Sequence, residues 1–203
     1  MSSESNTKSN LVDPSALGLM GLAMVTLVAS YAKFNPDQGV SYVIPWVIFL
    51  GAFAQLYASI IDSKKNNPFG TTVFGAYAFF WFGVGTSWLM KLGVFGEGVQ
   101  SAIEPTQLGV AFIGYLVFSL YMTIAAVETN KVLLIIMVLI DILLASLACT
   151  TLGFMKELTH LIAAYTELAI SIMSFYASAA NALNNQFGRI FLPVGKPLGI
   201  FKK

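Results

Sequence analysis

The sequence predicts an all-α membrane protein with six transmembrane helices in each protomer. Of its 203 residues, 57% are hydrophobic and only 10% are charged, whereas a soluble domain averages about 25% charged residues. So few charges cannot cover a surface in water, and we expect the apolar exterior to face a lipid bilayer. The apolar residues also form continuous runs, which excludes a membrane barrel, because barrel strands alternate over about ten residues.

Six of these runs are long enough to cross the hydrocarbon core, which takes about 20 residues in a helix. Short segments rich in Asn, Gly, Pro and charged residues separate them and leave no room for a second domain. The predicted spans are residues 16–34, 41–61, 71–90, 107–127, 132–152 and 161–183.

The remaining segments predict the topology. Residues 1–13 lack a signal-peptide pattern, and we expect them to form a disordered cytoplasmic tail. We expect residues 14–185 to form the transmembrane domain and residues 186–203 to form a cytoplasmic C-terminal tail. The tails and the loops on their side hold eight Lys or Arg residues, and the opposite loops hold three. Because positive loops stay in the cytoplasm, we expect a multi-pass protein of the cell membrane with both termini cytoplasmic.

Small residues recur along the first, third and sixth spans. Gly18 and Gly21 lie in the first, Gly75 and Gly83 in the third, and Ser174 in the sixth. Small side chains let helices approach each other closely in lipid. We interpret most of these residues as packing positions, and some as residues that leave room for a narrow path.

Two carboxyl groups lie inside predicted spans. Asp141 is near the middle of the fifth, and Glu167 is about two turns into the sixth. An Asp at mid-span costs about 2.5–3.5 kcal/mol on insertion scales, so it usually has a role or a partner. Two interpretations remain open for each group. In the first it is a proton relay or a polar element of the path, and it is neutral or exchanges a proton during passage. In the second it is a carboxyl group bonded across helices or at the contact between subunits. Gln55, in the second span, either binds a carboxylate oxygen or ties two helices together.

Several classes of function find no support in the sequence. The net charge of +1 provides no basic field for nucleic acid. There is no phosphate loop, metal-ligand spacing or nucleophile constellation, and Cys149 and His160 are each the only residue of their type. We therefore expect no cofactor, no metal and no enzymatic reaction. Asp62, Lys64 and Lys65 are interpreted as solvated loop charges.

Three stretches carry a resemblance to a known family. DPSALGLMGLAM, residues 13–24, resembles the N-P-A-P-L-G-L signature that opens the first helix of the acetate uptake transporter family. GAFAQLYASIIDSKKNNPFGTTVFGAYAFFW, residues 51–81, is similar to the family's second and third helices with their K-K-x-N-x-F-G loop. LNNQFGRIFLPVG, residues 183–195, is similar to the C-terminal L-N-E-Q-F-G-R-x-x-L-P-x-G. The stretches occur in the family's order and spacing.

This resemblance implies a homohexamer with a separate path through each subunit. The path would carry acetate and similar small monocarboxylates, sometimes succinate, by proton symport or as a channel. The resemblance also implies an apolar constriction midway along the path, at positions that fall on Leu22, Tyr77 and Ile140. The first of these is usually aromatic in the family, so Leu22 predicts a wider or more flexible gate. We expect the Tyr77 hydroxyl to hydrogen-bond the carboxylate while the apolar side chains of the constriction contact the methyl group.

The first helix begins with a further candidate feature. A helix N-terminus offers free N–H donors and a partial positive charge, both of which favour a carboxylate. Asp13 stands where the signature has Asn and suits a helix cap, and Pro14 suits the first helical position. Ser174 aligns with a small residue that is implicated in substrate size. The candidates for substrate binding or coupling are Asp13, Gly18, Leu19, Gln55, Asp141, Glu167 and Ser174.

Two alternatives remain open at this point. One is a channel for a small neutral solute, such as ammonia, water or an undissociated acid. The other is a membrane assembly protein that transports nothing, although no sensory domain favours it.

Overall fold

The structure, a computed structural model, describes residues 11–201, and this part of the chain contains helices and no strands. Six helical segments are each long and apolar enough to cross a membrane, as the sequence predicts. Most of the predicted N-terminal tail lies outside the described residues. The spans are α1 (Ser15–Phe34), the second span formed by α2 (Ile44–Trp46), η2 (Val47–Ala54) and α3 (Gln55–Lys64), α4 (Pro68–Lys91), α6 (Pro105–Ala126), α7 (Lys131–Thr151) and α8 (Lys156–Phe187).

Side chains fix where several helices begin. The Asn67 and Asn130 side-chain oxygens accept hydrogen bonds from backbone N–H groups in the first turns of α4 and α7, which satisfies donors that have no partner inside the helix. α1 begins at Ser15 with Pro14 as its N-cap, one residue later than predicted, and Asp13 just before it accepts a hydrogen bond from the N–H of Ser15 at 2.9 Å. Pro68 is the first residue of α4, a position where proline loses no intrahelical bond.

Some boundaries differ from the predicted ones. The last helix begins at Lys156 rather than at residue 161, because Gly153 (φ 82°) and Met155 (φ 46°) reverse the chain within three residues. Residues 156–160, which lie between the predicted fifth and sixth spans, therefore form the first turn of α8. The second span continues to Lys64 rather than ending at residue 61. Short helices also occupy two connections, η1 (Pro36–Gln38) and α5 (Glu97–Ser101).

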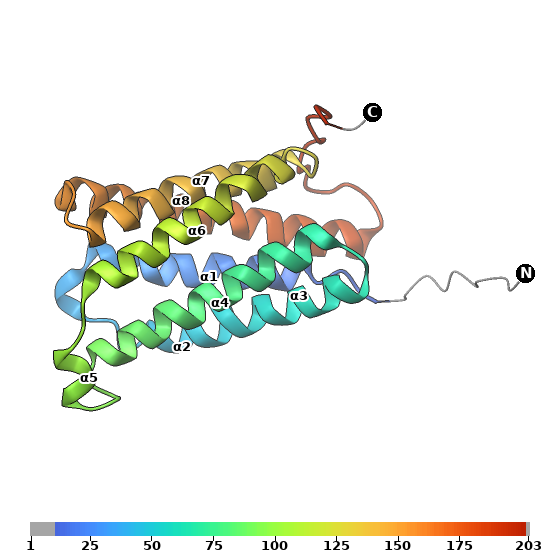
Figure 1. Ribbon diagram of the computed structural model, residues 1–203. Coiled ribbons are helices and arrows are strands. Elements are labelled where there is room, and N and C mark those ends of the chain that lie inside the picture. The colour runs from blue at the N-terminus through green and yellow to red at the C-terminus, as the bar shows by residue number, and fades with distance from the viewer. Residues whose placement is uncertain (1–10, 202–203) are drawn as a thin grey trace, which may run out of the picture.

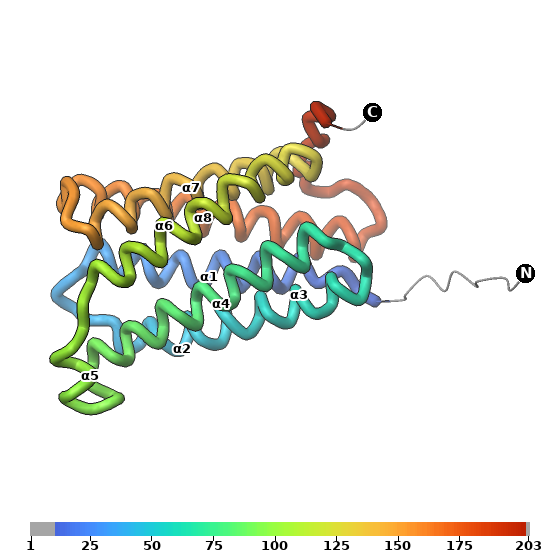
Figure 2. The backbone as a smooth tube through the Cα atoms, viewed as in Figure 1, coloured from blue at the N-terminus to red at the C-terminus, as the bar shows by residue number. Residues whose placement is uncertain are grey.

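The six spans form a closed ring of antiparallel helices (Figure 1). α1 packs between α8 and the second span, α4 packs against the second span and against α6, and α7 packs against α6 and α8. The tube in Figure 2 shows α1, in blue, between the second span and α8. One end of the ring, called here the terminal end, consists of the segments around Ser15, Lys64, Pro68, Ala126, Lys131 and Phe187.

The middle of the second span is a π-helix. η2 consists of eight apolar residues, VIFLGAFA, with wider turns than the α-helix that follows it. Gly51 lies at its centre against Val25 and Trp81, where a Cβ would be 2.8 Å from a methyl of Val25 and 3.0 Å from the indole. Such segments are often found at functional sites. In this protein the π-helix ends directly before Gln55.

The chain after α8 folds back over the terminal end. The N–H of Val132 donates to the carbonyl of Val194 at 3.1 Å, and the N–H of Leu198 donates to the carbonyl of Val127 at 3.0 Å. Gly188 ends α8 in the left-handed conformation, with φ 62°, which glycine adopts without steric cost. The described part of the predicted C-terminal tail is therefore held against the connection between α6 and α7.

Candidate functional site

A cavity of about 210 Å³ lies inside the ring at the terminal end. One water molecule needs roughly 10–15 Å³ measured in this way, so the cavity has room for a small solute and several waters. Residues of α1, α3, α4, α7 and α8 line it, together with the connection between α6 and α7 and Val194 of the C-terminal segment. The cavity therefore lies inside the bundle, is partly open at the terminal end, and is bordered there by Val194 of the chain end.

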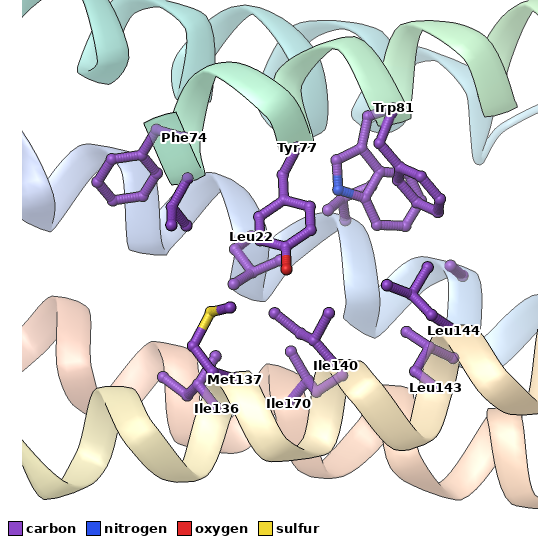
Figure 3. Close-up of a cluster of buried hydrophobic side chains, with 14 of the residues drawn as sticks. Leu22, Phe74, Tyr77, Trp81, Ile136, Met137, Ile140, Leu143, Leu144 and Ile170 are labelled. Carbon is purple, nitrogen blue, oxygen red and sulfur yellow. The ribbon is translucent and has the colours of Figure 1, made fainter. Parts of the chain in front are cut away.

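Leu22, Tyr77 and Ile140 all line this cavity and are at most 7% exposed. They come from α1, α4 and α7, three helices that are far apart in the sequence. Figure 3 shows Tyr77 and Ile140 pointing toward one another from opposite sides, with Leu22 beside the tyrosine ring. The structure thus brings together the three residues of the predicted constriction. They are referred to below as the collar.

Apolar side chains continue the packing beyond the collar, away from the terminal end. Trp81 and Leu144 lie one turn further along α4 and α7 (Figure 3), and each is at most 4% exposed. Phe80 contacts the rings of Trp81 and Tyr115 with centroids 5.1 and 5.0 Å apart. The collar therefore lies between the cavity and a densely packed aromatic layer.

The hydroxyl of Tyr77 already has a partner. It donates to Oγ of Ser119 on α6 at 2.9 Å, and Ser119 is fully buried. A Tyr hydroxyl has a single proton to donate. For Tyr77 to donate to a passing carboxylate, its hydrogen bond to Ser119 must break or reverse.

The cavity has polar groups at its mouth and wall. Asn67 and Asn130 line the mouth, and each uses its side-chain oxygen to cap a helix, which leaves the NH₂ group of the same amide available as a donor. Ser15, in the first turn of α1, adds a hydroxyl. Together with the apolar wall, these donors suit a small solute that has a carboxylate at one end and a hydrocarbon group at the other.

Gln55 and Leu19 are two further predicted candidates that line the cavity. Gln55 is completely buried, and its Nε2 donates to the carbonyl of Gly51 at 2.8 Å. Its oxygen has no hydrogen-bond partner among residues 11–201. Gln55 therefore offers a free acceptor inside the cavity.

The interpretation of Asp62 as a solvated loop charge is wrong. Asp62 lies within α3, is 1% exposed and lines the cavity. The reason is that the helix continues past residue 61, so that Asp62 lies seven residues after Gln55 and on the same helix face. This spacing of seven was the signal in the sequence, and the neighbouring lysines concealed it.

Three other predicted candidates lie outside the cavity lining. Gly18 is packed so tightly that a Cβ would be 2.6 Å from the ring of Phe74, and Asp13, just before α1, accepts from the N–H of Ser15. Ser174 is fully buried on α8, and its hydroxyl has no partner in the described chain. Gly18 thus serves close helix packing beside the cavity wall.

The two carboxyl groups inside spans are each bonded across helices. Asp141 accepts from the hydroxyl of Thr123 on α6 at 2.8 Å. Glu167 accepts from Nζ of Lys33 on α1 at 2.8 Å, and the two side chains are only 2% and 15% exposed. Neither acid belongs to the cavity lining. These contacts favour the interpretation of both groups as links between helices.

Breaking the Lys33–Glu167 pair should destabilise the bundle. Replacing Glu167 with Leu leaves the largely buried ammonium of Lys33 without its carboxylate, and we expect a loss of about 2–3 kcal/mol, below the roughly 3–5 kcal/mol of a fully buried pair because Lys33 retains some exposure. The double replacement Lys33→Met with Glu167→Leu should recover most of the loss, since no charge is then left buried. Denaturant unfolding in detergent measures both. Equal destabilisation of the single and double variants would contradict the assignment.

Comparisons with known proteins agree with this architecture. Residues 2–196 match the GPR1/FUN34/yaaH family. The chain is 31% identical over 192 residues to the succinate-acetate/proton symporter SatP of Escherichia coli K12, covering 94% of this chain and 98% of that protein. It is 26% identical over 123 residues to ammonia transport outward protein 2 of Saccharomyces cerevisiae, covering 58% of this chain and 43% of that protein.

A solved structure has the same fold. The bacterial acetate channel SatP superposes with a TM-score of 0.80 at 30% identity, covering 91% of this chain and 99% of that one. Family match, sequence identity and structural likeness all extend over nearly the whole length of the chain. The chain is therefore a member of the GPR1/FUN34/yaaH family.

Proposed function

We propose that this protein transports acetate and similar small monocarboxylates across the cell membrane, through a path inside each subunit. The observation that carries the proposal is the cavity inside the bundle, which reaches Leu22, Tyr77 and Ile140. Its mouth offers amide and hydroxyl donors and its wall is apolar, which suits a carboxylate with a methyl group. The names of the bacterial relatives, a succinate-acetate/proton symporter and an acetate channel, support the same substrate.

In this proposal the collar acts as the gate. Apolar constrictions control passage by excluding water, so a carboxylate must lose part of its hydration before it passes Leu22 and Ile140. Tyr77 compensates for that loss when its hydroxyl turns from Ser119 to the carboxylate. Gln55 and Leu19, which line the same cavity, contact the substrate before the gate. Gly18, Asp13 and Ser174 maintain the shape of the wall, while Asp141 and Glu167 hold the helices together.

We further propose a homohexamer with both termini in the cytoplasm. Large apolar side chains on α6, among them Val110, Val117 and Leu120, are at least half exposed, and they suit contact with lipid or with a neighbouring subunit. The positive loop residues are concentrated at the terminal end, which supports a cytoplasmic position for that end. The cavity then opens toward the cytoplasm.

Reconstitution tests the function directly. The purified oligomer, placed in liposomes, should take up radiolabelled acetate with saturation, well above the uptake of protein-free liposomes. We expect formate and propionate to compete strongly, and lactate and succinate to compete less, because the cavity is small. Absence of saturable acetate uptake by a correctly assembled oligomer would overturn the proposal.

The yeast relative named for ammonia transport makes a neutral solute the second candidate. The same liposomes, loaded with a pH-sensitive dye, report ammonia entry as an internal alkalinisation. We expect no acceleration of this signal by the protein. Ammonia entry without acetate uptake would replace the proposed substrate with a neutral one.

A further inference from the structure

The cavity contains a buried carboxylate with no hydrogen-bond partner. Asp62 is 1% exposed, and neither of its oxygens is bonded to any group among residues 11–201. The side-chain amide of Asn67 lies beside the carboxylate as a potential donor, but neither oxygen of Asp62 has the geometry of a hydrogen bond to it. Gly70 on α4 faces the same carboxylate, and a Cβ at that position would overlap Oδ2 of Asp62. The glycine thus provides the space in which the carboxylate lies.

Asp62 forms no salt bridge among residues 11–201, although the charge of Lys65 attracts its carboxylate. The ionisable groups that face it are Asp13, before α1, and Lys65, after α3. The nearest approach between those two is 4.0 Å, from Nζ of Lys65 to Oδ1 of Asp13. The other elements around the mouth, α7, α8 and the connection before α7, contribute Thr129, Asn130, Asn181 and apolar side chains, and no charged group, to the cavity. Asp62 is the only carboxylate among the lining residues.

The free polar atoms of the cavity wall therefore include three acceptors, both oxygens of Asp62 and Oε1 of Gln55. A buried acceptor without a donor is costly, and a buried charge without a partner is more so. The amides of Asn67 and Asn130 at the mouth bond none of these three acceptors in the structure, so the acceptors still need a donor. A metal ion shared by the two residues does not fit, because seven helical residues separate them by about 10 Å, whereas oxygen ligands lie about 2–2.6 Å from a hard cation. A proton on Asp62 meets the requirement with a single atom.

The proposed substrate sharpens this requirement. An ionised Asp62 and an ionised acetate in one cavity inside the bundle repel each other, and the repulsion is strong where water is scarce. A protonated Asp62 presents an O–H donor to the acetate carboxylate instead. Protonation thus changes Asp62 from a group that repels the substrate into one that binds it.

We propose that Asp62 is the proton-binding residue of the transport path, and that a carboxylate occupies the cavity only together with a proton on Asp62. This rests on the proposed function. The step is an acid–base equilibrium in which water at the mouth supplies the proton, which forms an O–H bond on one oxygen of Asp62 and returns to water when the substrate leaves. By linkage, acetate strengthens the binding of the proton as much as the proton strengthens the binding of acetate.

Proton counting tests the proposal on the purified oligomer. Acetate binding is measured by calorimetry in buffers with different ionisation enthalpies, from about pH 6 to about pH 8, which gives the number of protons taken up for each acetate bound. Where Asp62 is ionised in the free protein, we expect uptake of about one proton and an affinity that falls about tenfold for each pH unit.

The variants separate Asp62 from other sources of protons. Asp62→Asn has nearly the same size and always carries a donor, so it should bind acetate with no proton uptake and no pH dependence. Asp62→Glu retains the acid and should retain the uptake. Asp37→Asn, which removes an exposed acid from the loop after α1, should behave like the parent chain.

The outcomes are distinct. Proton uptake by Asp62→Asn equal to that of the parent, or acetate binding by the parent with no proton uptake at any pH, would overturn the proposal even if the Asn variant failed to fold. Binding of ammonium or sodium that depends on Asp62 and replaces the proton would assign the site to a cation. Acetate flux without proton linkage would contradict only the role proposed for Asp62. The absence of both acetate binding and acetate flux would contradict the proposed transport function.

Discussion

Replacing Ile140 with Trp is expected to slow acetate uptake by about 100-fold, equivalent to about 2.7 kcal/mol of added barrier. Ile140 stands opposite Tyr77 where the cavity ends (Figure 3). An indole at this position fills the space between α4 and α7 and leaves no passage for a two-carbon acid. Because Ile140 borders a cavity, part of the added volume is accommodated without displacing packed atoms. Radiolabelled acetate uptake by proteoliposomes measures the effect.

The same helix offers a matched control. Val138→Trp adds a similar volume two residues earlier, on the exposed face of α7, and it should leave uptake close to that of the parent. The opposite change, Ile140→Ala, should widen the gate and increase the uptake of propionate and lactate relative to acetate. If Ile140→Trp transports as fast as Val138→Trp, and Ile140→Ala accepts the same acids as the parent, the collar is not the gate.

Gly21→Val should prevent formation of the native bundle. Gly21 in α1 lies against the backbone of the second span, and a Cβ would overlap the carbonyl oxygen of Leu50. A backbone carbonyl cannot rotate away as the end of a side chain can, so α1 and η2 must separate. Overpacking of a dense core costs about 1–3 kcal/mol even where side chains can adjust. Here we expect the monodisperse oligomer peak in detergent chromatography to disappear.

Gly83 provides the comparison for this prediction. It is also a helical glycine inside a span, in α4, but a Cβ there meets no atom within 4 Å. Gly83→Val should therefore assemble normally, apart from the small helix-propensity difference between the two residues. Normal assembly of Gly21→Val would show that α1 and η2 are further apart than described.

The comparison of Gly21 with Gly83 shows what a sequence can and cannot predict. Span length and apolar continuity determine the six helices, because lipid leaves the backbone no alternative to helix. The small residues indicate that helices pack closely. They do not reveal which glycine faces a neighbour and which faces outward, since this depends on how the helices are rotated in the assembled ring.

In the candidate site, too, some features could be predicted from the sequence and others could not. The collar followed from the resemblance, and the structure brings its three residues together. Asp62 was missed because two lysines follow it, and α3 extends past the predicted end by less than one turn. The partner of Glu167 was unpredictable for another reason. Lys33 is 134 residues away in sequence, and an ion pair between helices carries no local signal.

The π-helix makes the direction of the cavity's polar groups depend on a residue count. η2 contains no polar residue, yet every side chain after it takes its angular position from the number of residues in those wide turns. Losing one residue there would rotate Gln55 and Asp62 together by about 100° about the helix axis, away from the cavity and toward a neighbouring helix or the lipid. This purely apolar segment thus sets the direction in which the polar side chains after it point. Shortening or lengthening it would alter function even though every polar residue is still present in the sequence.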